Sequence, residues 1–424
     1  LFAAFVSVQI NKRWKSYFIW LLILQIGMYG VFLAKDVILF FIFFEITLIP
    51  AFFLISIWGY KEREKSALQF LIYNGVGSAL MLIAFVLLVA TAGFQIVQMD
   101  HGLSEVMYTG DWEVIMSNLS DPAAFVNMGM DQFSNPFHLS ENMRWLIFVL
   151  LLIAFGIKLP IFPFHSWMLK VHTEAPTALV MIHSGILLKM GAYGLIRFGV
   201  MMFPEQAKSW AFILALLGLI NILYGAILAM IQTEFKLLLA YSSISHMGIV
   251  LFGIAAFNAV GFQGAIIQLI SHGFISALLF MTIGSIYERT KTTRLENLGG
   301  LARSAPFISG IMLIGGLASL GLPGLSGFVS EFLSFLGLFE SLPIVTAFGT
   351  LGIIFTAAYV LRGVLSITFG QQPQTLTDIR DARFIEALPM IAMVAFILLI
   401  GIYPAVVSDP LQITIQSMLT RIGG

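Results

Sequence analysis

Long apolar segments, separated by shorter polar connections, run along almost the whole chain of 424 residues. A helix needs about 20 apolar residues to cross the hydrocarbon core of a bilayer, because each residue adds only about 1.5 Å of length. Segments of about this length or more lie at 16–34, 37–59, 67–92, 145–161, 176–200, 209–231, 236–257, 260–287, 307–341, 343–369 and 385–407. The pattern therefore predicts an all-α polytopic membrane protein.

Two of these segments are interrupted, at corresponding places in the two halves of the chain. Pro160 and Pro163 break the segment that begins at 145, and GLPGLSG lies inside the segment at 307–341. Proline removes an intrahelical donor, and non-helical backbone at membrane depth survives only where it lines a cavity or other protein. Each interrupted segment comes third after the segment that opens its half, at 16 or at 209. Paired broken helices indicate an internal repeat with a site near the middle of the membrane.

Composition narrows the class of protein further. Hydrophobic residues make up 59% of the chain and charged residues 10%, whereas soluble domains are about half apolar and a quarter charged. The net charge of zero gives no reason to expect a nucleic-acid partner. The absence of cysteine excludes disulfides, thiolate metal sites and iron–sulfur clusters held by this chain. Residues 1–9 resemble the end of a helix, so we expect further helices to precede the chain.

Basic residues predict the orientation of the spans. If the spans alternate, most Lys and Arg residues fall on one side, beginning at 12–15 and 61–65. The other side holds fewer basic residues and an acidic connection at 93–143, which includes Asp100 and Asp131. The positive-inside rule places the basic side in the cytoplasm. We therefore predict that the C-terminus lies on the outer side.

Four ionisable residues lie within the apolar segments: Glu45, Lys158, Lys189 and Glu331. Such residues are costly in a membrane and typically mark an ion pathway. We expect Glu45 and Lys158 to approach each other near the midplane, so that their separation controls whether the lysine holds a proton. A static ion pair between helices is the plainer reading of that pair, and snorkelling to an interface is the plainer reading of Lys189. Glu331, directly after the GLPGLSG break, suits a terminal proton donor or acceptor.

Histidines supply further protonatable groups, because an unperturbed imidazole titrates near neutral pH. His246 joins the candidate relay, since three serines lie within four residues of it. His183 and His272 are candidates for the relay or for a water path, and each can equally be a hydrogen-bonded packing residue. Lys236 begins a span, so it either caps a water path on the cytoplasmic side or acts as an ordinary positive-inside anchor. No histidine spacing predicts a metal site.

Five motifs that contain these residues point to a known family. They are FFEITLIPAFFLISIWG, KLPIFPFHSWMLKVHTEAPTA, GILLKMGAYGLIRF, FKLLLAYSSISHMG and GLPGLSGFVSEF. Together they resemble the antiporter-like membrane subunits of the proton-pumping NADH:quinone oxidoreductase (complex I), over almost the whole chain. Glu331 favours the M-type chains, because the L- and N-type chains and the large antiporter subunits typically have lysine there. TALVMIHSG and Leu237 depart from the usual M-type pattern.

The resemblance implies an antiporter-like fold with two inverted five-helix repeats and two broken helices, with the N-terminal helices missing from this chain. Residues 1–15 would be the end of a helix and a loop, and 385–424 the last transmembrane helix and a tail. The first repeat would span 16–200, with its break near 158–163. The second repeat would span 209–369, with its break near 321–327.

The implied function is that of a proton-translocating membrane subunit of respiratory complex I. The relay would consist of Glu45, Lys158, Lys189, His246 and Glu331. Other subunits would oxidise NADH, reduce quinone and hold every redox cofactor. The expected partners are L-, N- and K-type membrane chains, the lipid bilayer and protons, in the inner or plasma membrane of a bacterium.

Two other functions are compatible with the sequence. One is a subunit of a multisubunit cation/proton antiporter or of a membrane-bound hydrogenase, which share the fold. The other is a non-transporting membrane scaffold. A scaffold gains nothing from the cost of burying four ionisable residues, which argues against it.

Overall fold

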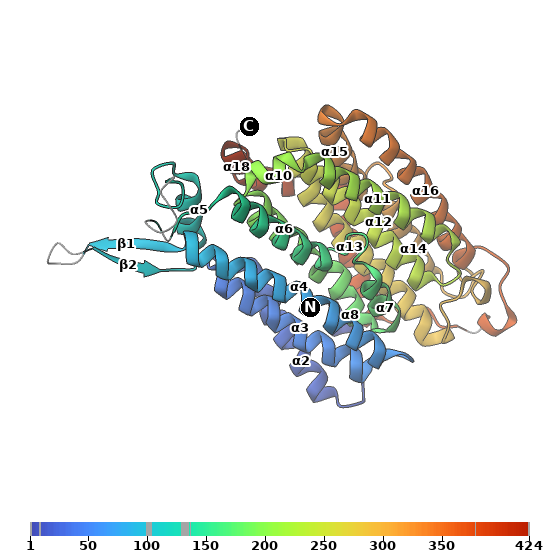
Figure 1. Cartoon of the computed structure of the whole chain (residues 1–424). Coiled ribbons are helices and arrows are strands. Elements are labelled where there is room, and N and C mark those ends of the chain that lie inside the picture. The colour runs from blue at the N-terminus through green and yellow to red at the C-terminus, as the bar shows by residue number, and fades with distance from the viewer. Residues whose placement is uncertain are drawn as a thin grey trace.

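The computed structural model describes residues 2–7, 10–98, 104–128, 135, 137–377 and 379–422. It is a helical bundle from one end of which a two-stranded hairpin projects (Figure 1). In the described part of the chain, nine helical stretches are long and apolar enough to cross a membrane. They are Trp14–Leu33 (α2), Val37–Trp58 (α3), Arg63–Ala92 (α4), Thr177–Val200, Ala211–Ile231 (α11), Phe235–Ala255 (α12), Ala259–Thr290 (α13), Pro343–Thr368 (α16) and Phe384–Ile402 (α17). The predicted multi-pass helical membrane fold is confirmed.

The stretch Thr177–Val200 is one continuous helix whose hydrogen-bond pattern changes along its length. It consists of α8 (Thr177–Ile182), a π-helical turn η2 (His183–Leu187), α9 (Leu188–Gly194) and a second π-helical segment η3 (Leu195–Val200). Such turns are rare and occur frequently at functional sites.

Both interrupted segments form pairs of helices. The first pair is α6 (Glu141–Lys158) and α7 (Ser166–Glu174), and the second is α14 (Pro306–Ser319) and α15 (Ser326–Ser341). In the second break, Gly321 and Gly324 have φ angles of +78° and +91°, which glycine adopts at no steric cost. The grouping of the helices into two inverted five-helix repeats stays a prediction.

The remaining elements are short or lie at the ends of the bundle. They are α1 (Phe2–Val6), the antiparallel strands β1 (Phe94–Gln98) and β2 (Ser104–Tyr108), α5 (Trp112–Ser120), α10 (Pro204–Ser209), the 3₁₀ turns η4 (Leu295–Asn297) and η5 (Gln374–Leu376), and α18 (Ala405–Ile422). The predicted C-terminal tail is thus mostly helical. Asp100 and Asp131 of the acidic connection, and residues 1, 8, 9, 423 and 424 of the terminal segments, lie outside the described residues.

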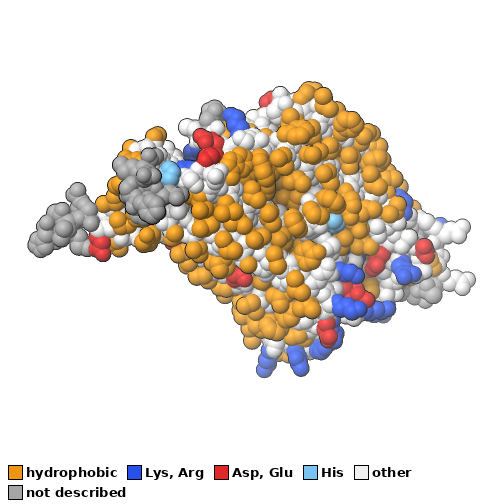
Figure 2. Space-filling view, in the orientation of Figure 1, with side chains coloured by type: hydrophobic (Ala, Val, Ile, Leu, Met, Phe, Trp, Pro, Cys, Tyr) orange, Lys and Arg blue, Asp and Glu red, His pale blue; other side chains and the backbone are white. Residues whose placement is uncertain are grey.

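Burial separates three central helical stretches from the others. In the most apolar part of α12, 89% of the residues are buried, and the values for Thr177–Val200 and α13 are 78% and 72%. In α2 and α17 the value is 33%. Orange apolar side chains cover most of the bundle's visible face in Figure 2. A polar side chain on a central helix is therefore shielded from lipid by other helices.

Glycines allow the central helices to approach closely. A Cβ atom on Gly225 of α11 would lie 2.6 Å from the amide nitrogen of Ser245 on α12. Real Cβ atoms essentially never come within 3.0 Å of another heavy atom. Larger side chains here would push α11 away from α12.

Lysine and arginine side chains gather at one end of the bundle, at the lower right of Figure 2. Just before α2, the carbonyl of Lys12 accepts a hydrogen bond from the Trp58 indole at 2.6 Å, which joins the start of α2 to the end of α3. The C-terminal helix ends elsewhere, near α5 (Figure 1), where the Arg421 guanidinium lies 5.4 Å from the centre of the Trp112 ring.

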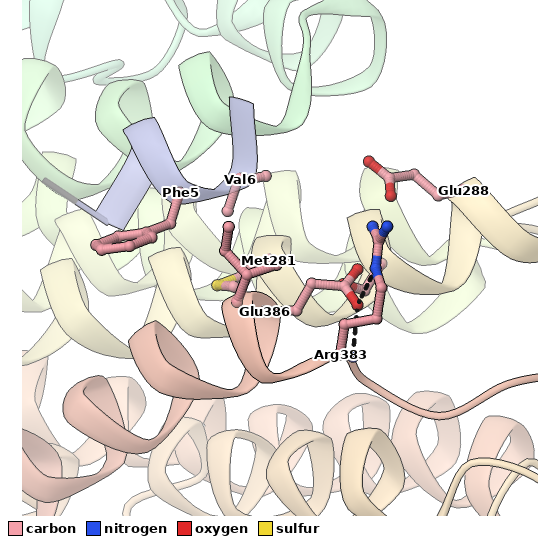
Figure 3. Close-up of a pocket in the computed structure, with 8 residues that line it drawn as sticks. Phe5, Val6, Met281, Glu288, Arg383 and Glu386 are labelled. Atoms are coloured by element: carbon pink, nitrogen blue, oxygen red, sulfur yellow. Dashed lines mark hydrogen bonds and ion pairs between the residues drawn. The ribbon is translucent and has the colours of Figure 1, made fainter. Parts of the chain in front are cut away.

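An ion-pair cluster ties α17 to α13 at the basic end. The Arg289 guanidinium donates to Glu386 at 2.7 Å, and Arg383 contacts the same carboxylate at 3.5 Å. Figure 3 shows Arg383 and Glu386 of this cluster beside a small pocket between α1, α13 and α17. The pocket is lined by Phe5, Val6, Met281, Ser285, Glu288, Arg383, Ile385 and Glu386. None of these residues belongs to the predicted relay, and the cluster holds helices together.

Candidate functional site

Glu45 and Lys158 occupy neighbouring helices, but the structure forms no direct ion pair between these two described residues. Lys158 is the last residue of α6 and is 2% exposed. Its ammonium lies 5.1 Å from the Phe44 ring centre and 5.6 Å from that of Phe70. Such cation–π contacts stabilise a buried cation. Glu45 is only partly buried, and one of its carboxylate oxygens is buried without a hydrogen-bond partner.

Lys158 and Glu45 are nevertheless near enough to attract each other electrostatically. The predicted close approach is thus not seen as a contact, and control of the Lys158 proton by Glu45 stays a prediction. The aromatic rings of Phe44 and Phe70 lie next to the Lys158 ammonium, where we had expected the carboxylate of Glu45. A small rotation of either charged side chain would change their separation, which keeps the loading hypothesis open.

A buried histidine pair lies beyond Lys158. His172 Nε2 and His183 Nδ1 are 2.9 Å apart, and both side chains are fully buried. His172 comes from α7 and His183 from the π-helical turn η2, so the pair joins the broken helix to the continuous one. The second ring nitrogen of each histidine is buried without a protein partner. Each imidazole thus has one nitrogen engaged and one available for a further hydrogen bond.

Lys189 lies at the centre of the polar arrangement. Its side chain is 5% exposed, and its ammonium donates to the backbone carbonyl of Ser184. The same nitrogen lies 2.8 Å from Nδ1 of His272 on α13. Ser184 belongs to the π-helical turn, so the local change of helix type provides an acceptor for the lysine. Lys189 is therefore a buried hydrogen-bonded group and does not snorkel.

His272 leads to a second cluster, centred on His246 of α12. The two imidazole ring centres are 5.3 Å apart. Nδ1 of His246 lies 3.3 Å from Oε1 of Glu331 on α15 and 3.3 Å from the amide nitrogen of Gln268. On the other side of the ring, Nε2 is 3.3 Å from the hydroxyl of Ser319, the last residue of α14. His246 thus contacts both halves of the second broken helix.

The helix break itself is adjusted to Glu331. A Cβ atom on Gly321 would lie 2.9 Å from Oε2 of Glu331, so a larger residue there would displace the carboxylate as well as strain the backbone at φ +78°. A cavity of about 10 Å³ is bounded by His246, Gln268, His272, Ser319, Gly327 and Glu331, together with Ile275 and Ala318. Its volume is close to that needed for one water molecule, and its polar lining offers hydrogen bonds.

Buried polar groups thus extend from Lys158 through His183, His172, Lys189, His272 and His246 to Glu331, and we call this series the polar axis. Lys158 and Lys189 act on the histidine pair only by longer-range electrostatic interaction. Direct contacts join Lys189 to His272 and His246 to Glu331. Lys236 is not part of the axis. It lies at the start of α12, between two tyrosine rings at the basic end. His165 also lies apart, with Nε2 3.1 Å from the Tyr224 hydroxyl.

Sequence reasoning missed His172, Gln268, Ser319 and Ser330. The hydroxyl of Ser330 donates to Oε1 of Gln268, which in turn contacts His246. Gln268 lies four residues before His272, so it shares a helix face with a predicted candidate. That four-residue spacing is the sequence signal by which Gln268 could have been found. Within the described ranges, no group of three or more His, Asp or Glu side chains is arranged to hold a metal ion.

The chain is similar in sequence to a family of known membrane proteins. A family model described as NADH:quinone oxidoreductase/Mrp antiporter, TM, matches residues 34–356. The chain is 37% identical to NAD(P)H-quinone oxidoreductase chain 4 2 of Thermosynechococcus vestitus, over 100% of this chain and 75% of that protein. It is 37% identical to NADH-quinone oxidoreductase subunit M of Rhodobacter capsulatus, over 95% of this chain and 74% of that protein.

A solved structure has the same fold. A chain of respiratory complex I from Thermus thermophilus with bound NADH superposes with a TM-score of 0.85 at 29% sequence identity. The superposition covers 100% of this chain and 82% of that one.

Proposed function

The chain belongs to the NADH:quinone oxidoreductase/Mrp antiporter family of transmembrane proteins, and we propose that its buried polar axis carries protons. It is an M-type membrane subunit of a proton-pumping NADH:quinone oxidoreductase, a translocase. NADH oxidation and quinone reduction belong to other subunits, and we assign no redox cofactor to this chain. Its partners are other membrane subunits, of the L, N and K types.

The observation that carries the proposal is the continuity of protonatable groups across the centre of the bundle. Lys189 contacts His272, the His272 and His246 rings lie side by side, and His246 contacts Glu331. A proton in hydrocarbon needs a hydrogen-bonded partner at each step, because an unsatisfied polar group there costs several kcal/mol. Burying this many ionisable groups in a membrane is costly, and such residues typically mark ion pathways and proton relays.

The axis divides into a loading side and a release side. Lys158 takes up a proton when Glu45 is near enough to stabilise its charge, and loses it when the separation grows. The His172–His183 pair and Lys189 lie between the two helix breaks. His246, Glu331 and the adjoining cavity form the far end, where a water molecule would complete the hydrogen bonds. We assign the relay to these residues on geometry.

We place the protein in the inner or plasma membrane of a bacterium, with the basic end in the cytoplasm. The C-terminal helix then ends on the outer side, beside α5. The described part of the acidic connection at 93–143 lies on that same side. Labelling of a C-terminal tag in intact cells would check this orientation.

The substitution Glu331→Gln tests the proposed function. Glutamine keeps the shape and can hydrogen-bond, but it has no proton to exchange. We expect the complex to assemble and to oxidise NADH while the number of protons pumped per NADH falls in vesicles. Glu340→Gln is the matched control, because Glu340 is an exposed glutamate of the same helix that accepts a hydrogen bond from the Asn258 amide at 3.0 Å.

Normal pumping by an assembled Glu331→Gln complex would remove Glu331 from the pathway. Proton movement driven by sodium, and independent of NADH oxidation, would instead assign the chain to a cation/proton antiporter. Both measurements use the same vesicles, with a pH-sensitive dye inside.

A further inference from the structure

A buried lysine lies between two tyrosine rings at the basic end of the bundle. The Lys236 ammonium is 4.1 Å from the ring centre of Tyr60 and 4.8 Å from that of Tyr287. The two ring centres are 4.9 Å apart, with an angle of 68° between the rings. Lys236 is only 3% exposed. We call Tyr60, Lys236 and Tyr287 the aromatic cage.

The cage holds a cation without giving it a hydrogen-bond acceptor. Within the described residues, the Lys236 ammonium has neither a hydrogen bond nor a direct ion pair. Glu234 and Glu174 attract it from a distance. The faces of aromatic rings stabilise a cation electrostatically. They cannot accept and pass on a proton as a carboxylate or imidazole can, so the hydrogen-bonded route is interrupted here.

The three residues come from both halves of the chain. Tyr60 lies in the connection between α3 and α4, Lys236 is the second residue of α12, and Tyr287 is near the end of α13. The amide of Tyr60 donates to the backbone carbonyl of Glu174 at 2.7 Å, and its hydroxyl is hydrogen-bonded to Thr177. Movement of the connection after α3 would therefore move one wall of the cage.

The cage lies at the ends of the elements that carry the axis. Glu174 is two residues beyond His172 on α7, and Thr177 opens the helix that contains His183 and Lys189. Lys236 is ten residues before His246 on α12, roughly 15 Å along that helix. A path from cytoplasmic water to the histidine pair or to His246 along these helices would start at the cage.

We propose that the aromatic cage is the closed cytoplasmic entrance to the polar axis, and that Tyr60 and Tyr287 are positioning residues that hold Lys236 across it. The inference rests on the proposed proton transport and goes beyond it, since it assigns the point where water is excluded. With the rings together, the ammonium charge repels incoming cations and the rings keep water out. With the rings apart, Lys236 meets water and can exchange its proton with it at the mouth of the axis.

The chemistry of Tyr60 fits a neutral wall. Burial raises its pKa to about 12, and the nearby Glu174 and Glu288 oppose its ionisation further. The ring therefore remains uncharged at physiological pH and presents its face to the cation. Its hydroxyl serves the hydrogen bond to Thr177.

Cysteine labelling tests the entrance directly, because the natural chain contains no cysteine. Ser243 is 1% exposed and lies seven residues after Lys236, two helical turns further inward on the same face of α12. The substitution Ser243→Cys places a thiol behind the cage. The rate of its reaction with a small cationic methanethiosulfonate added to the cytoplasmic side of vesicles reports whether the entrance is open.

We expect slow labelling with the cage intact, and labelling roughly tenfold faster when Tyr60→Leu or Tyr287→Leu is added. Tenfold corresponds to about 1.4 kcal/mol, the scale of one buried cation–π contact. Tyr60→Phe and Tyr287→Phe keep the rings and should restore slow labelling. Ser245→Cys is the matched control, because Ser245 is 1% exposed but contacts the Ile222 carbonyl of α11 and faces away from the cage.

Two results would overturn the entrance. One is fast labelling of the Ser243→Cys thiol with the cage intact. The other is unchanged slow labelling in an assembled leucine variant. Should both leucine variants fail to assemble, Lys236→Met keeps the volume and removes the charge, and it must also speed labelling. Labelling does not require pumping, so the entrance and the relay are tested separately. If Glu331→Gln loses pumping while the leucine variants still label slowly, only the entrance is refuted. Normal pumping in Glu331→Gln would refute the proposed relay.

Discussion

Gly191 tests how tightly the helix that carries Lys189 is held against the helix that carries Lys158. It lies in α9, two residues after Lys189, and packs against the last turn of α6. A Cβ atom at Gly191 would lie 2.7 Å from the amide nitrogen of Leu159 and 2.9 Å from the carbonyl oxygen of Phe155. Both neighbours are backbone atoms, so neither can rotate away as a side chain would.

The size of the effect of Gly191→Ala follows from these distances. Ordinary Cβ contacts begin at 3.4 Å, so the helices must separate by about 0.7 Å at this point. Adding a methyl group to a packed site costs roughly 1–3 kcal/mol. Alanine gains about 1 kcal/mol over glycine within a helix. Gly75→Ala, in α4, measures that gain alone, because nothing lies within 4 Å of a Cβ atom there.

The comparison of the two variants isolates the clash. In the assembled complex we expect Gly191→Ala to unfold at a lower temperature than Gly75→Ala and to pump fewer protons per NADH oxidised. Displacements of about 1 Å can cost a factor of roughly a hundred where groups must be held in a reactive geometry. Equal thermal midpoints and equal pumping in the two variants would refute the argument that close packing at Gly191 positions Lys189.

Three further predictions follow from the same contacts. Lys189→Ala should stop proton transport even with both ends of the axis intact. Lys189→Arg should hold a proton and fail to release it, because guanidinium stays charged. Full proton transport by the arginine variant would show that Lys189 is only a fixed charge. His172→Phe should lower pumping while NADH oxidation continues, since it removes the partner of His183; unchanged pumping would exclude the pair from the relay. Glu386→Gln should lower the thermal midpoint, because breaking a buried pair with Arg289 costs up to roughly 3–5 kcal/mol; the protons pumped per NADH by surviving complexes should not change.

The spans could be predicted because apolar length is a property of contiguous sequence. The segments at 37–59 and 343–369 correspond to α3 and α16, which end at Trp58 and Thr368. GLPGLSG was recognisable because glycine and proline interrupt helices, and two of its three glycines, Gly321 and Gly324, take backbone angles that other residues avoid. A carboxylate or ammonium within an apolar run was also recognisable, since the sequence alone shows that a charged group lies where burying it is energetically costly.

Contacts between distant segments could not be predicted in this way. His172 and His183 meet because a turn brings α7 beside η2, and the sequence places no marker on that pairing. Lys158 faces the rings of Phe44 and Phe70, a side-chain orientation that depends on packing between α3, α4 and α6. Tyr287 is one of many aromatic residues, so nothing in the sequence separates it from ordinary filling.

The distribution of burial explains why the axis runs where it does. Its groups lie mainly on α12, on α13 and on the helix from Thr177 to Val200, the most buried stretches of the bundle. Polar groups there are kept from lipid, so their hydrogen bonds are made only with one another or with water. Glu45 differs from the groups of the axis in its burial, because it sits on α3, is only partly buried and has an unpartnered oxygen. The groups of the axis itself, from Lys158 to Glu331, are buried, so Glu45 is the ionisable residue of the predicted relay that lies nearest to the surface of the bundle.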